Sequence, residues 1–485
     1  MSVARPVVLL RPSGPVRLAA GVGPAAPRLG LFLPGAPLHH LLLADLGLPL
    51  VVTSGNRAEE PIAIDDTAAM DQLGAIADGF LRHDRAIRSR YDDSVTRVVA
   101  GRPSIIRRAR GYSPEPLRLP VPSAQPLLAV GAQLKHTFTL AYDDVAFVGP
   151  HTGDLEQQAT MDAFTGNLAH LSRVVGIEPR VVAHDLHPGY LSTQYAARLP
   201  GRRIGVQHHH AHVASCAAEH GITEPFVGVA YDGLGFGDDG TLWGGEVFVA
   251  DLTSYQRVAR FGHAPLPGGA AAVRRPARMA LGYLFGDPDG GLLPVAEPFL
   301  RRLPEREVTT IARMVARGVN SPLTSSAGRL FDAVGALLGL CDDATYEGHA
   351  AVALEHAAGQ THVPPLPWRI AEYDGLLVYD PIPTLRGVLE ALRDNASIQQ
   401  IAAGFHNTIA DVTVELCART AQRHGVRTVC LSGGVMQNQR LATALLSGLA
   451  AAGLHPLINV NVPVNDGGIS YGQAAVAAAR LRGDE

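Results

Sequence analysis

Short apolar runs between glycine- and proline-rich turns predict a small α/β unit in the first part of the chain. Residues 29–33, 50–53 and 104–108 have the length and apolar content of strands. Residues 65–81 instead show apolar positions at helical spacing. Three short strands and a helix together favour a mixed α/β fold.

A proline-rich stretch at residues 113–126 (SPEPLRLPVPSAQP) separates two regions of different composition. Proline lacks a backbone N–H and fixes φ, so this stretch is unsuited to a helix or to a central strand. We therefore predict a linker at residues 116–126, between a domain at 1–115 and a domain at 127–485.

A weak internal repeat follows this linker, because residues 130–155 can be laid over residues 227–252. Each copy has the pattern strand, glycine turn, strand, turn, strand. Helical segments are expected at residues 160–175, 276–284 and 326–340. Such a duplication predicts two related α/β lobes, and the cleft between two lobes is a favoured place for a ligand.

Composition is that of a globular protein. Of the 485 residues, 47% are hydrophobic and 18% are charged, and this length predicts two or three compact units. A net charge of -4 gives no strong field for a polyanion, so we expect no nucleic-acid partner. No segment approaches the roughly 18 unbroken apolar residues of a membrane helix and no leader is recognised, so we expect a cytoplasmic protein without a membrane partner.

The four cysteines are scattered among apolar neighbours and include no CxxC pair; they are Cys216, Cys341, Cys417 and Cys430. This pattern favours buried free thiols over a disulfide or a catalytic thiol.

The most specific local signal is a run of histidines, QHHHAH at residues 207–212, which opens a segment with the pattern of a helix. His208 and His212 would share one face of that helix, so both imidazoles could bind one metal ion. A buried or solvated histidine cluster is the alternative, and four histidines within five positions disfavour it. His209 and His210 face elsewhere and are candidates for catalytic contacts with a substrate.

Two aspartates in glycine-rich turns are candidate oxygen ligands for the same metal. Asp232 lies in YDGLGFG and Asp466 in NDGG, each after an apolar run. Glycine lets the backbone approach a metal or a phosphate where a side chain would collide. A hairpin turn is the alternative for either residue. At Asp466, which precedes a helical run at residues 469–481, helix capping competes with metal binding.

Two further turns of small residues precede expected helices and are candidates for nucleotide binding. One follows the apolar run at residues 428–431 and contains Gly433, Gly434 and Asn438; the other contains Gly328 and, beyond it, Asp332. An ordinary helix cap is the alternative in each case.

Other candidates lie in the first repeat and in the N-terminal unit. Lys135 could meet a phosphate or acyl-phosphate oxygen and Asp154 could orient a group in the cleft, although a surface lysine is the simpler interpretation. In the N-terminal unit, Ser54, Asn56 and Arg107 offer a hydroxyl, an amide and a guanidinium to a triphosphate. A surface turn beside a solvated basic run is the alternative there.

These motifs, in this order, resemble the HypF family of hydrogenase-maturation carbamoyltransferases. The resemblance runs nearly end to end and rests on LGLFLPGAPLHHLLL, VVTSGNRAEEPI, YDDSV, RRARGY, HDLHPGYLSTQYA, VQHHHAHVAS, YDGLGFGDDGTLWGGE, SSAGRLFDAVGALLG, CLSGGVMQNQRL and NDGGISYGQA. So many long motifs in one order make the resemblance highly specific.

The resemblance implies a YrdC-like domain that forms carbamoyl-adenylate from carbamoyl phosphate and ATP. It also implies a two-lobed Kae-type, TsaD-like domain of the actin, Hsp70 and sugar-kinase superfamily. That domain would transfer the carbamoyl group to the C-terminal cysteine of a HypE-type acceptor, for synthesis of the cyanide ligand of a NiFe site. The implied cofactors are ATP or carbamoyl-adenylate, a divalent metal that is iron or zinc, and Mg²⁺ with ATP.

Several residues match the family's functional positions. The metal ligands of the family fall on His208, His212, Asp232 and Asp466. The nucleotide signatures of its two domains fall on Ser54, Asn56, Gly433, Gly434 and Asn438.

The sequence also departs from the family pattern. Complete members begin with an acylphosphatase-like domain and a cysteine-rich zinc-finger region, and the first half of the YrdC-like domain would precede Arg5. Ala270 and Arg275 stand where the family usually has acidic residues. We expect a shortened chain, from a fragment, a mis-assigned start or a split gene, with an intact transfer site and a partial adenylation domain.

Two other functions fit parts of this pattern. An O-carbamoyltransferase that acts on a small molecule would use the same two domains, but known members place them in the opposite order. A non-catalytic nucleotide-binding scaffold for hydrogenase maturation is the alternative outside enzymes.

Overall fold

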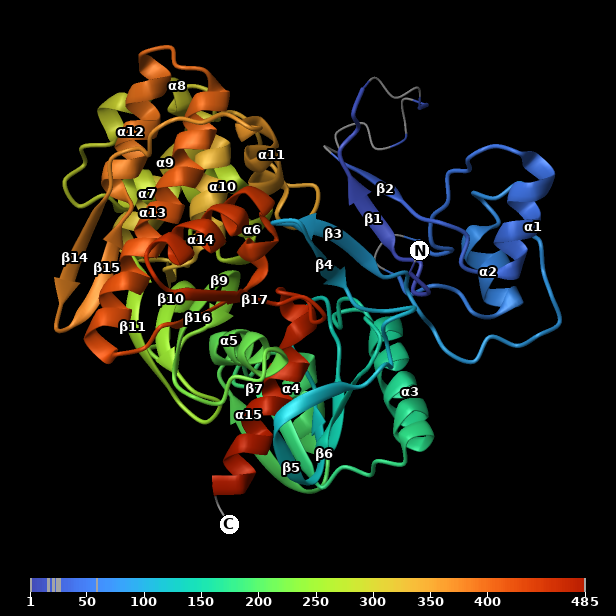
Figure 1. The fold of residues 1–485 in the computed structure, drawn as a ribbon. Helices are drawn as coiled ribbons and strands as arrows, with labels where there is room; N and C mark the ends of the chain where they lie inside the picture. The colour runs from blue at the N-terminus through green and yellow to red at the C-terminus, as the bar shows by residue number, and fades with distance from the viewer. Residues whose placement is uncertain (1, 15–17, 20–21, 23–27, 58–59, 484–485) are drawn as a thin grey trace. The chain divides into compact units, whose positions relative to one another are not determined.

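The chain forms two compact units in a computed structural model that describes residues 2–14, 18–19, 22, 28–57 and 60–483 (Figure 1). The first unit comprises Met1–Val206, Ala218–Ile222 and Asn459–Glu485. The second comprises Gln207–Ala217 and Thr223–Ile458.

The first unit opens with a four-stranded sheet in the order β2-β1-β3-β4. Its elements, with two helices, are β1 (Val7–Leu10), β2 (Leu29–Leu31), α1 (Pro37–Leu46), α2 (Asp66–Leu73), β3 (Val95–Val99) and β4 (Arg102–Arg107). The expected strands at residues 29–33 and 104–108 are therefore confirmed, as β2 and β4.

Two expectations for this region are wrong. Residues 50–53 form no strand, and Val51 is 72% exposed, because this apolar run has no hydrogen-bonded partner strand. The helix expected at residues 65–81 is only α2, which the side chain of Asp65 caps and which ends before Gly74. An apolar pattern alone does not make an element when tertiary packing does not support it.

The second sheet of this unit has the order β6-β5-β7-β8 and carries most of the unit's core. Its elements are β5 (Leu117–Ala129), β6 (Thr139–Val148), α3 (Gln158–Val175), β7 (Val181–Asp185), α4 (Leu191–Arg198), β8 (Arg202–Val206), η3 (Asp466–Gly468) and α15 (Ile469–Gly483). Leu128, Leu140 and Val182 on three of these strands pack with Phe164 of α3. Helix α15 packs on the same strands and is buried along most of its length.

The structure corrects our expectation for the proline-rich stretch. Much of it is strand β5, which lies between β6 and β7 in the sheet. Strand pairing with β7 is confined to Leu127–Ala129, and the carbonyl oxygen of Pro126 accepts one further hydrogen bond on that side, from the N–H of Arg180. The strand that pairs with the earlier part of β5 is β6. Pro120, Pro122 and Pro126 fall where the register with β6 shifts. The prolines are tolerated because they occupy irregular positions of the strand.

The second unit is built on a nine-stranded sheet whose main path is β14-β15-β11-β10-β9-β16-β17. Its strands are β9 (Phe226–Phe236), β10 (Leu242–Ala250), β11 (Tyr255–Phe261), β12 (Ala264–Pro265), β13 (Leu323–Thr324), β14 (Arg369–Tyr373), β15 (Leu376–Asp380), β16 (Thr428–Ser432) and β17 (His455–Ile458).

Most helices of the second unit gather on this sheet, where α10 packs against α7 and α11, and α13 packs against α11 and α14 (Figure 1). They are α6 (Ala270–Arg274), α7 (Pro276–Gly286), η1 (Leu293–Val295), α8 (Glu297–Leu300), α9 (Glu305–Arg317), α10 (Ala327–Leu337), α11 (His349–Ala358), α12 (Ile382–Arg393), α13 (Ile398–His424), η2 (Gly434–Gln437) and α14 (Gln439–Ala451). Helix α5 (His208–Glu219) begins in this unit and ends in the other.

The duplication is visible in the topology of the two larger sheets. In each, an antiparallel pair is followed by two parallel strands: β6-β5-β7-β8 in the first unit and β10-β9-β16-β17 in the second. Residues 130–155 contain β6, and residues 227–252 contain β10 and nearly all of β9. Neither copy therefore has the three strands that the pattern predicts, because β5 ends before the first copy and β11 begins after the second. The expected lobes are nevertheless related in their strand order.

Helices α3, α7 and α10 confirm the helical segments expected near residues 160–175, 276–284 and 326–340. All four cysteines are free and buried, as expected. Among the described residues, no helix is long and apolar enough to cross a membrane.

Candidate metal centre

Helix α5 presents His208 and His212 on consecutive turns of one face. The two imidazole rings lie 5.0 Å apart between centroids, and both side chains are almost completely buried. The expected helix at the histidine run, and the shared face of these two residues, are confirmed.

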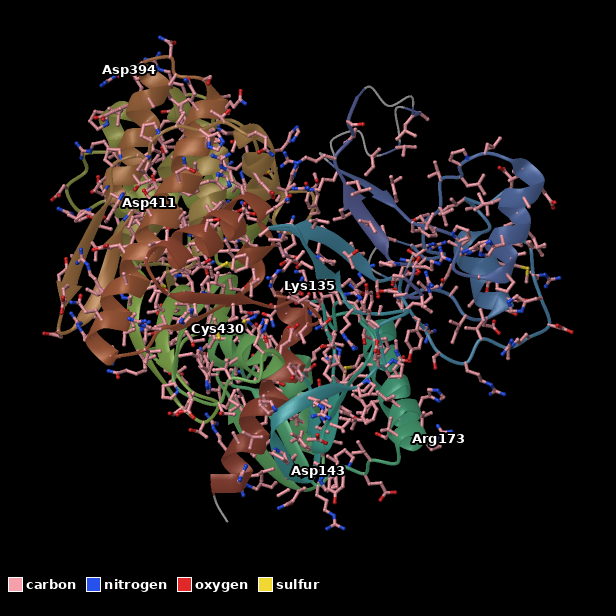
Figure 2. The ribbon with its side chains drawn as sticks, in the orientation of Figure 1. Lys135, Asp143, Arg173, Asp394, Asp411 and Cys430 are labelled. Carbon is pink, nitrogen blue, oxygen red and sulfur yellow. The ribbon has the colours of Figure 1, made fainter. Side chains whose placement is uncertain are left out.

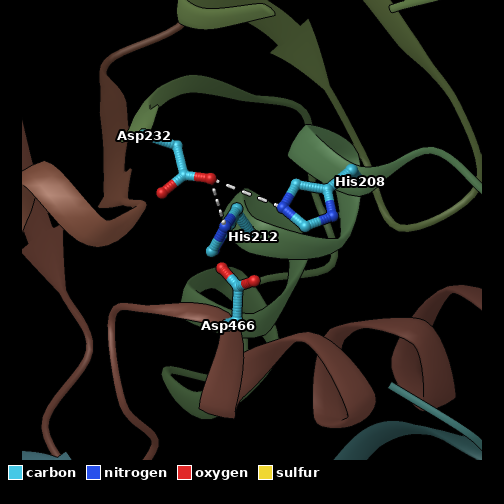
Figure 3. Close-up of side chains that lie close together, drawn as sticks. All are labelled: His208, His212, Asp232 and Asp466. Carbon is cyan, nitrogen blue, oxygen red and sulfur yellow. Dashed lines mark ion pairs between the residues drawn. The ribbon is translucent and has the colours of Figure 1, made fainter. Parts of the chain in front are cut away.

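Asp232 reaches the two histidines from strand β9 (Figure 3). Tyr231 pairs with Gly245 of β10 and Gly235 pairs with Trp243, so three residues of β9 oppose the single residue Gly244. This irregularity re-aims side chains, as β-bulges do beside functional sites. Asp232 thus lies in a bulged strand, not in the turn after a strand that the sequence suggested.

One carboxylate oxygen of Asp232 faces both imidazoles. Its Oδ2 atom lies 3.5 Å from Nε2 of His208 and 3.6 Å from Nε2 of His212. These distances exceed those of ordinary hydrogen bonds, which are about 2.7–3.2 Å. Two donor atoms bound tetrahedrally to one ion at about 2.1 Å would lie about 3.4 Å apart. The three donors therefore fit a small divalent metal better than they fit direct hydrogen bonds.

The charge of Asp232 is stabilised in spite of its burial. Burial alone would raise the pKa of this carboxyl, but the facing imidazoles of His208 and His212 hold the pKa well below its usual range. A deprotonated carboxylate beside imidazoles is the form that a metal requires.

Three of the predicted nucleotide-binding glycines lie against Asp232 or its neighbour Tyr231. The N–H of Gly434 donates to its Oδ1 at 2.9 Å. A Cβ at Gly328 would lie 3.0 Å from its carbonyl oxygen. Gly433 has φ +100°, and a Cβ there would lie 2.2 Å from the carbonyl oxygen of Tyr231. The structure therefore brings both glycine turns together with a metal-ligand candidate.

Ser326 fixes the same stretch of backbone. Its hydroxyl donates to the carbonyl oxygen of Asp232 at 2.8 Å and also contacts that of Gly233. The hydroxyl oxygen of Ser326 also accepts a hydrogen bond from the N–H of Arg329 at 3.1 Å, and so caps α10. One serine therefore links the start of a helix to the bulge that carries Asp232.

The two other nucleotide candidates of this unit have contacts within the fold. Asn438 caps α14 through its side-chain oxygen, and its amide nitrogen lies 2.9 Å from Nε2 of His406. Asp332 forms a buried ion pair with Arg329 at 2.7 Å, and burial raises its pKa to about 6. Their roles toward a nucleotide stay predictions.

The two middle histidines differ from each other. His209 is fully buried, and burial together with neighbouring His208 lowers its pKa, so its ring is neutral. His210 places Nε2 2.7 Å from the carbonyl oxygen of Asp251 and packs on Tyr255. The contacts of His210 anchor α5 to the β10–β11 turn, and its catalytic role stays a prediction.

Asp466, the remaining candidate ligand, belongs to the first unit, where it begins η3. The side chain of Asn465 accepts from the N–H of Gly467 and so caps η3. The two competing roles of Asp466, capping of the following helix α15 and metal binding, stay predictions.

Lys135 and Asp154 also belong to the first unit. Lys135 lies in the loop between β5 and β6 with φ +46° (Figure 2). Asp154 accepts from the backbone N–H of Glu156 at 3.0 Å, as in a local turn. Neither contact tests a catalytic role, so both roles stay predictions.

The N-terminal candidates lie in irregular segments or at a strand end. The amide nitrogen of Asn56 donates to the carbonyl oxygens of Arg57 and Glu60 at 2.8 and 2.9 Å, while Ser54 is exposed. Arg107, at the end of β4, lies 4.0 Å from Asp92.

The departure from the family pattern at Arg275 is balanced by acidic neighbours. Its guanidinium contacts Glu307 at 2.7 Å and Asp343 at 2.9 Å. The basic side chain is thus held in ion pairs, and Ala270 begins the short helix α6.

Sequence reasoning gave no role to three residues of the site, Gln207, Glu246 and Ser325. Gln207 precedes the histidine run and contacts the backbone of His210. Glu246 of β10 is fully buried and accepts a hydrogen bond from Ser325, which immediately precedes the cap of α10. Burial raises the pKa of Glu246 to about 7. An acidic residue within an apolar strand, as in WGGEVFVA, was the available signal.

Comparison with family models gives three matches along the chain. Residues 228–473 match the model described as "Carbamoyltransferase, Kae1-like Domain, second subdomain". Residues 122–219 match the "HypF Kae1-like domain", and residues 1–109 match the Sua5/YciO/YrdC model, described as "Telomere recombination". These matches confirm the expected YrdC-like and Kae-type folds.

Curated relatives agree. A carbamoyltransferase HypF from Synechocystis is 39% identical over 97% of this chain and 63% of its own length. HypF2 of Cupriavidus necator is 40% identical over 98% of this chain and 64% of its own length. A HypF homolog of the same organism is 38% identical over 73% of this chain and 91% of its own length. The chain thus spans less than two thirds of the first two relatives.

Two solved structures match nearly the whole chain. A full-length HypF in a phosphate- and nucleotide-bound form has a TM-score of 0.95 and 40% identity, over 99% of this chain and 75% of that one. HypF of T. kodakarensis has a TM-score of 0.90 and 30% identity, over 99% of this chain and 64% of that one. On the family models and these relatives together, the chain belongs to the HypF carbamoyltransferase family.

Proposed function

We propose that this chain transfers a carbamoyl group from carbamoyl-adenylate to the C-terminal cysteine of a HypE-type acceptor protein during maturation of NiFe hydrogenase. The observation that carries the proposal is the convergence of His208, His212 and Asp232 with two glycine turns in one buried place. Relatives at about 40% identity that bear the name carbamoyltransferase support it.

A divalent metal, iron or zinc, fits this donor set. His208, His212 and Asp232 would hold it, and Asp466, which matches the fourth position of the family pattern, completes the set in this proposal. When bound, such a metal supplies a Lewis acid that polarises an oxygen of the substrate. Two imidazoles and two carboxylates suit either metal.

The glycine turns are proposed to hold the nucleotide part of the donor. Gly328, Gly433 and Gly434 lack side chains where the stretch of β9 around Asp232 packs against them. Backbone N–H groups of these segments are proposed to bind phosphate oxygens beside that stretch. The matched solved structure of HypF in a phosphate- and nucleotide-bound form supports nucleotide binding by a chain of this family. Asn438 and Asp332 would then contribute mainly by fixing the helices that carry these turns.

The transfer step needs a thiol that this chain does not supply. Burial raises the pKa of Cys341 to about 11 and that of Cys417 to about 12, so both stay protonated at neutral pH. The acceptor's thiol, on losing its proton to water, forms a bond from sulfur to the carbamoyl carbon. The bond from that carbon to the phosphate oxygen breaks, and AMP leaves with the electron pair. The buried site holds the anhydride away from water.

The two half-reactions are proposed to lie in different parts of the chain. Residues 127–485 would carry out the transfer, whereas residues 1–115 would bind ATP, with Mg²⁺, through Ser54, Asn56 and Arg107. Lys135 and Asp154 are proposed to contact the donor.

The test compares two donors. The purified chain is mixed with a HypE-type acceptor and given either preformed carbamoyl-adenylate or carbamoyl phosphate with ATP and Mg²⁺. The acceptor's mass is then followed for addition of one carbamoyl group. Transfer from the preformed donor is the expected result. No transfer from either donor would refute the proposal and leave a binding role.

A further inference from the structure

The side-chain amide of Gln207 has only one orientation that satisfies its neighbours. Its oxygen lies 2.9 Å from the backbone nitrogen of His210, which can only donate. Its nitrogen lies 3.0 Å from the carbonyl oxygen of Phe236, which can only accept. The amide therefore accepts from His210 and donates to Phe236, and it cannot be flipped without losing both hydrogen bonds.

This orientation determines where His209 carries its proton. The amide nitrogen of Gln207 also lies 3.1 Å from Nδ1 of His209. Because that nitrogen is a donor, Nδ1 must accept. A neutral imidazole that accepts at one nitrogen has its proton on the other, so Nε2 of His209 is an N–H donor.

The Nε2 atom of His209 is buried, and within the part of the chain that the structure describes it has no hydrogen-bond partner. It faces the glycine-rich bulge of β9, where a Cβ at Gly235 would lie 3.0 Å from this nitrogen and 2.5 Å from Cε1 of the same ring. The bulge also contains Asp232, and a Cβ at Gly233 would meet nothing within 4 Å. A buried donor is thus directed at a stretch of backbone with open space beside it.

Leaving a buried N–H unsatisfied is unfavourable, so a substrate oxygen is the natural acceptor for it. We propose that His209 donates a hydrogen bond from Nε2 to the carbonyl oxygen of the carbamoyl group, and that Gln207 is the positioning residue that makes this donor available. The proposal rests on the proposed carbamoyl transfer and adds to it a residue for the oxygen on which negative charge develops.

The first test reads the proton position directly. The histidine rings of the whole chain are labelled with ¹⁵N, and the cross-peak that disappears in His209→Gln assigns the residue. In the wild type we expect the pattern of an imidazole protonated at Nε2. A ring protonated at Nδ1 would overturn the inference, whether or not the chain transfers carbamoyl groups.

Gln207→Glu tests the positioning role. A carboxylate can only accept, so Nδ1 of His209 would become the donor and Nε2 the acceptor. We expect the NMR pattern of His209 to switch and kcat to fall by about 10²- to 10³-fold, the usual effect of losing one oxyanion donor. An unchanged proton position in a folded variant would contradict the role of Gln207.

Two variants of His209 itself, His209→Ala and His209→Gln, test the donor role without a change at Gln207. Both should retain metal content and nucleotide affinity, whereas kcat falls by about 10²-fold or more in the alanine variant and by less in the glutamine variant, whose amide can still donate. Equal kcat in the wild type and the alanine variant would overturn the inference. Absence of transfer in the wild type would instead refute the proposed function.

Discussion

The carboxylate of Asp232 on strand β9 accepts a hydrogen bond from the backbone N–H of Gly434 at 2.9 Å, across 202 positions of sequence. Its other oxygen faces the two imidazoles of α5. One aspartate therefore contacts both the candidate metal ligands of α5 and one of the glycine turns. Changes to either part are expected to affect the other.

Replacing both His208 and His212 by alanine should abolish metal binding, because two of the three donors in the second unit are lost. The chain should still fold but with lower stability, because Asp232 keeps its hydrogen bond from Gly434 and loses the two imidazoles that stabilise its buried charge. Metal content per chain, measured by mass spectrometry of the purified protein, checks this. His424→Ala, which removes an exposed histidine at the end of α13, is the matched control and should keep the metal. Wild-type metal content in the double variant would refute the site.

Asp232→Asn removes the negative charge of this side chain and keeps its shape. The asparagine oxygen can still accept from Gly434, but a neutral amide is a poor ligand for iron or zinc beside two imidazoles. We expect metal affinity to fall by at least about tenfold with little change in the unfolding midpoint. Competition with a metal chelator measures the affinity. An affinity equal to that of the wild type would show that the carboxylate does not bind the metal.

Gly433→Ala should destabilise the second unit. The residue has φ +100°, and the new Cβ would lie 2.2 Å from the carbonyl oxygen of Tyr231. Backbone strain and overpacking together should lower the free energy of unfolding by roughly 3 kcal/mol or more. Gly453→Ala is the control, because it has φ +77° with nothing within 4 Å of the new atom. It should cost only about 1 kcal/mol in urea unfolding, and equal losses would contradict the close approach.

Glu246→Gln should change how stability depends on pH. Burial raises the pKa of this carboxyl from 4.5 to about 7 in the folded chain, although the hydrogen bond from Ser325 and the charge of Arg257, 3.9 Å away, act in the opposite direction. The folded state therefore binds more protons than the unfolded state between these values. The free energy of unfolding should therefore fall by about 3 kcal/mol as the pH rises from about 4.5 to about 7.

The glutamine variant should lack this decrease. Its free energy of unfolding should change less than that of the wild type between about pH 5 and about pH 8. Urea unfolding at several pH values measures the difference. Glu178→Gln, at an exposed position, is the matched control and should behave as the wild type. If the free energy of unfolding falls equally with pH in the wild type and in Glu246→Gln, then Glu246 does not cause the pH dependence.

The sequence predicted the parts of the site that depend on local geometry. His208 and His212 share a helix face because they are four residues apart, and a glycine marks the turn at Gly433, where φ is +100°. These features follow from spacing or from backbone conformation, which a single sequence displays.

The other parts depend on tertiary contacts. The amide of Gln207 acquires its role only when Phe236 and His209 lie on either side of it. Residues 113–126 form much of β5 because β6 offers a partner along one edge, whereas residues 50–53 remain outside any strand. No local pattern distinguishes these cases, since both depend on which strand lies alongside.

The burial of all four cysteines has a practical consequence for measuring the reaction. A thiol-reactive dye added under native conditions would find no accessible sulfhydryl on this chain, so its signal would come from the acceptor protein alone. Loss of labelling with time would then report capping of the acceptor's terminal cysteine directly, in the complete mixture and without separating the two proteins.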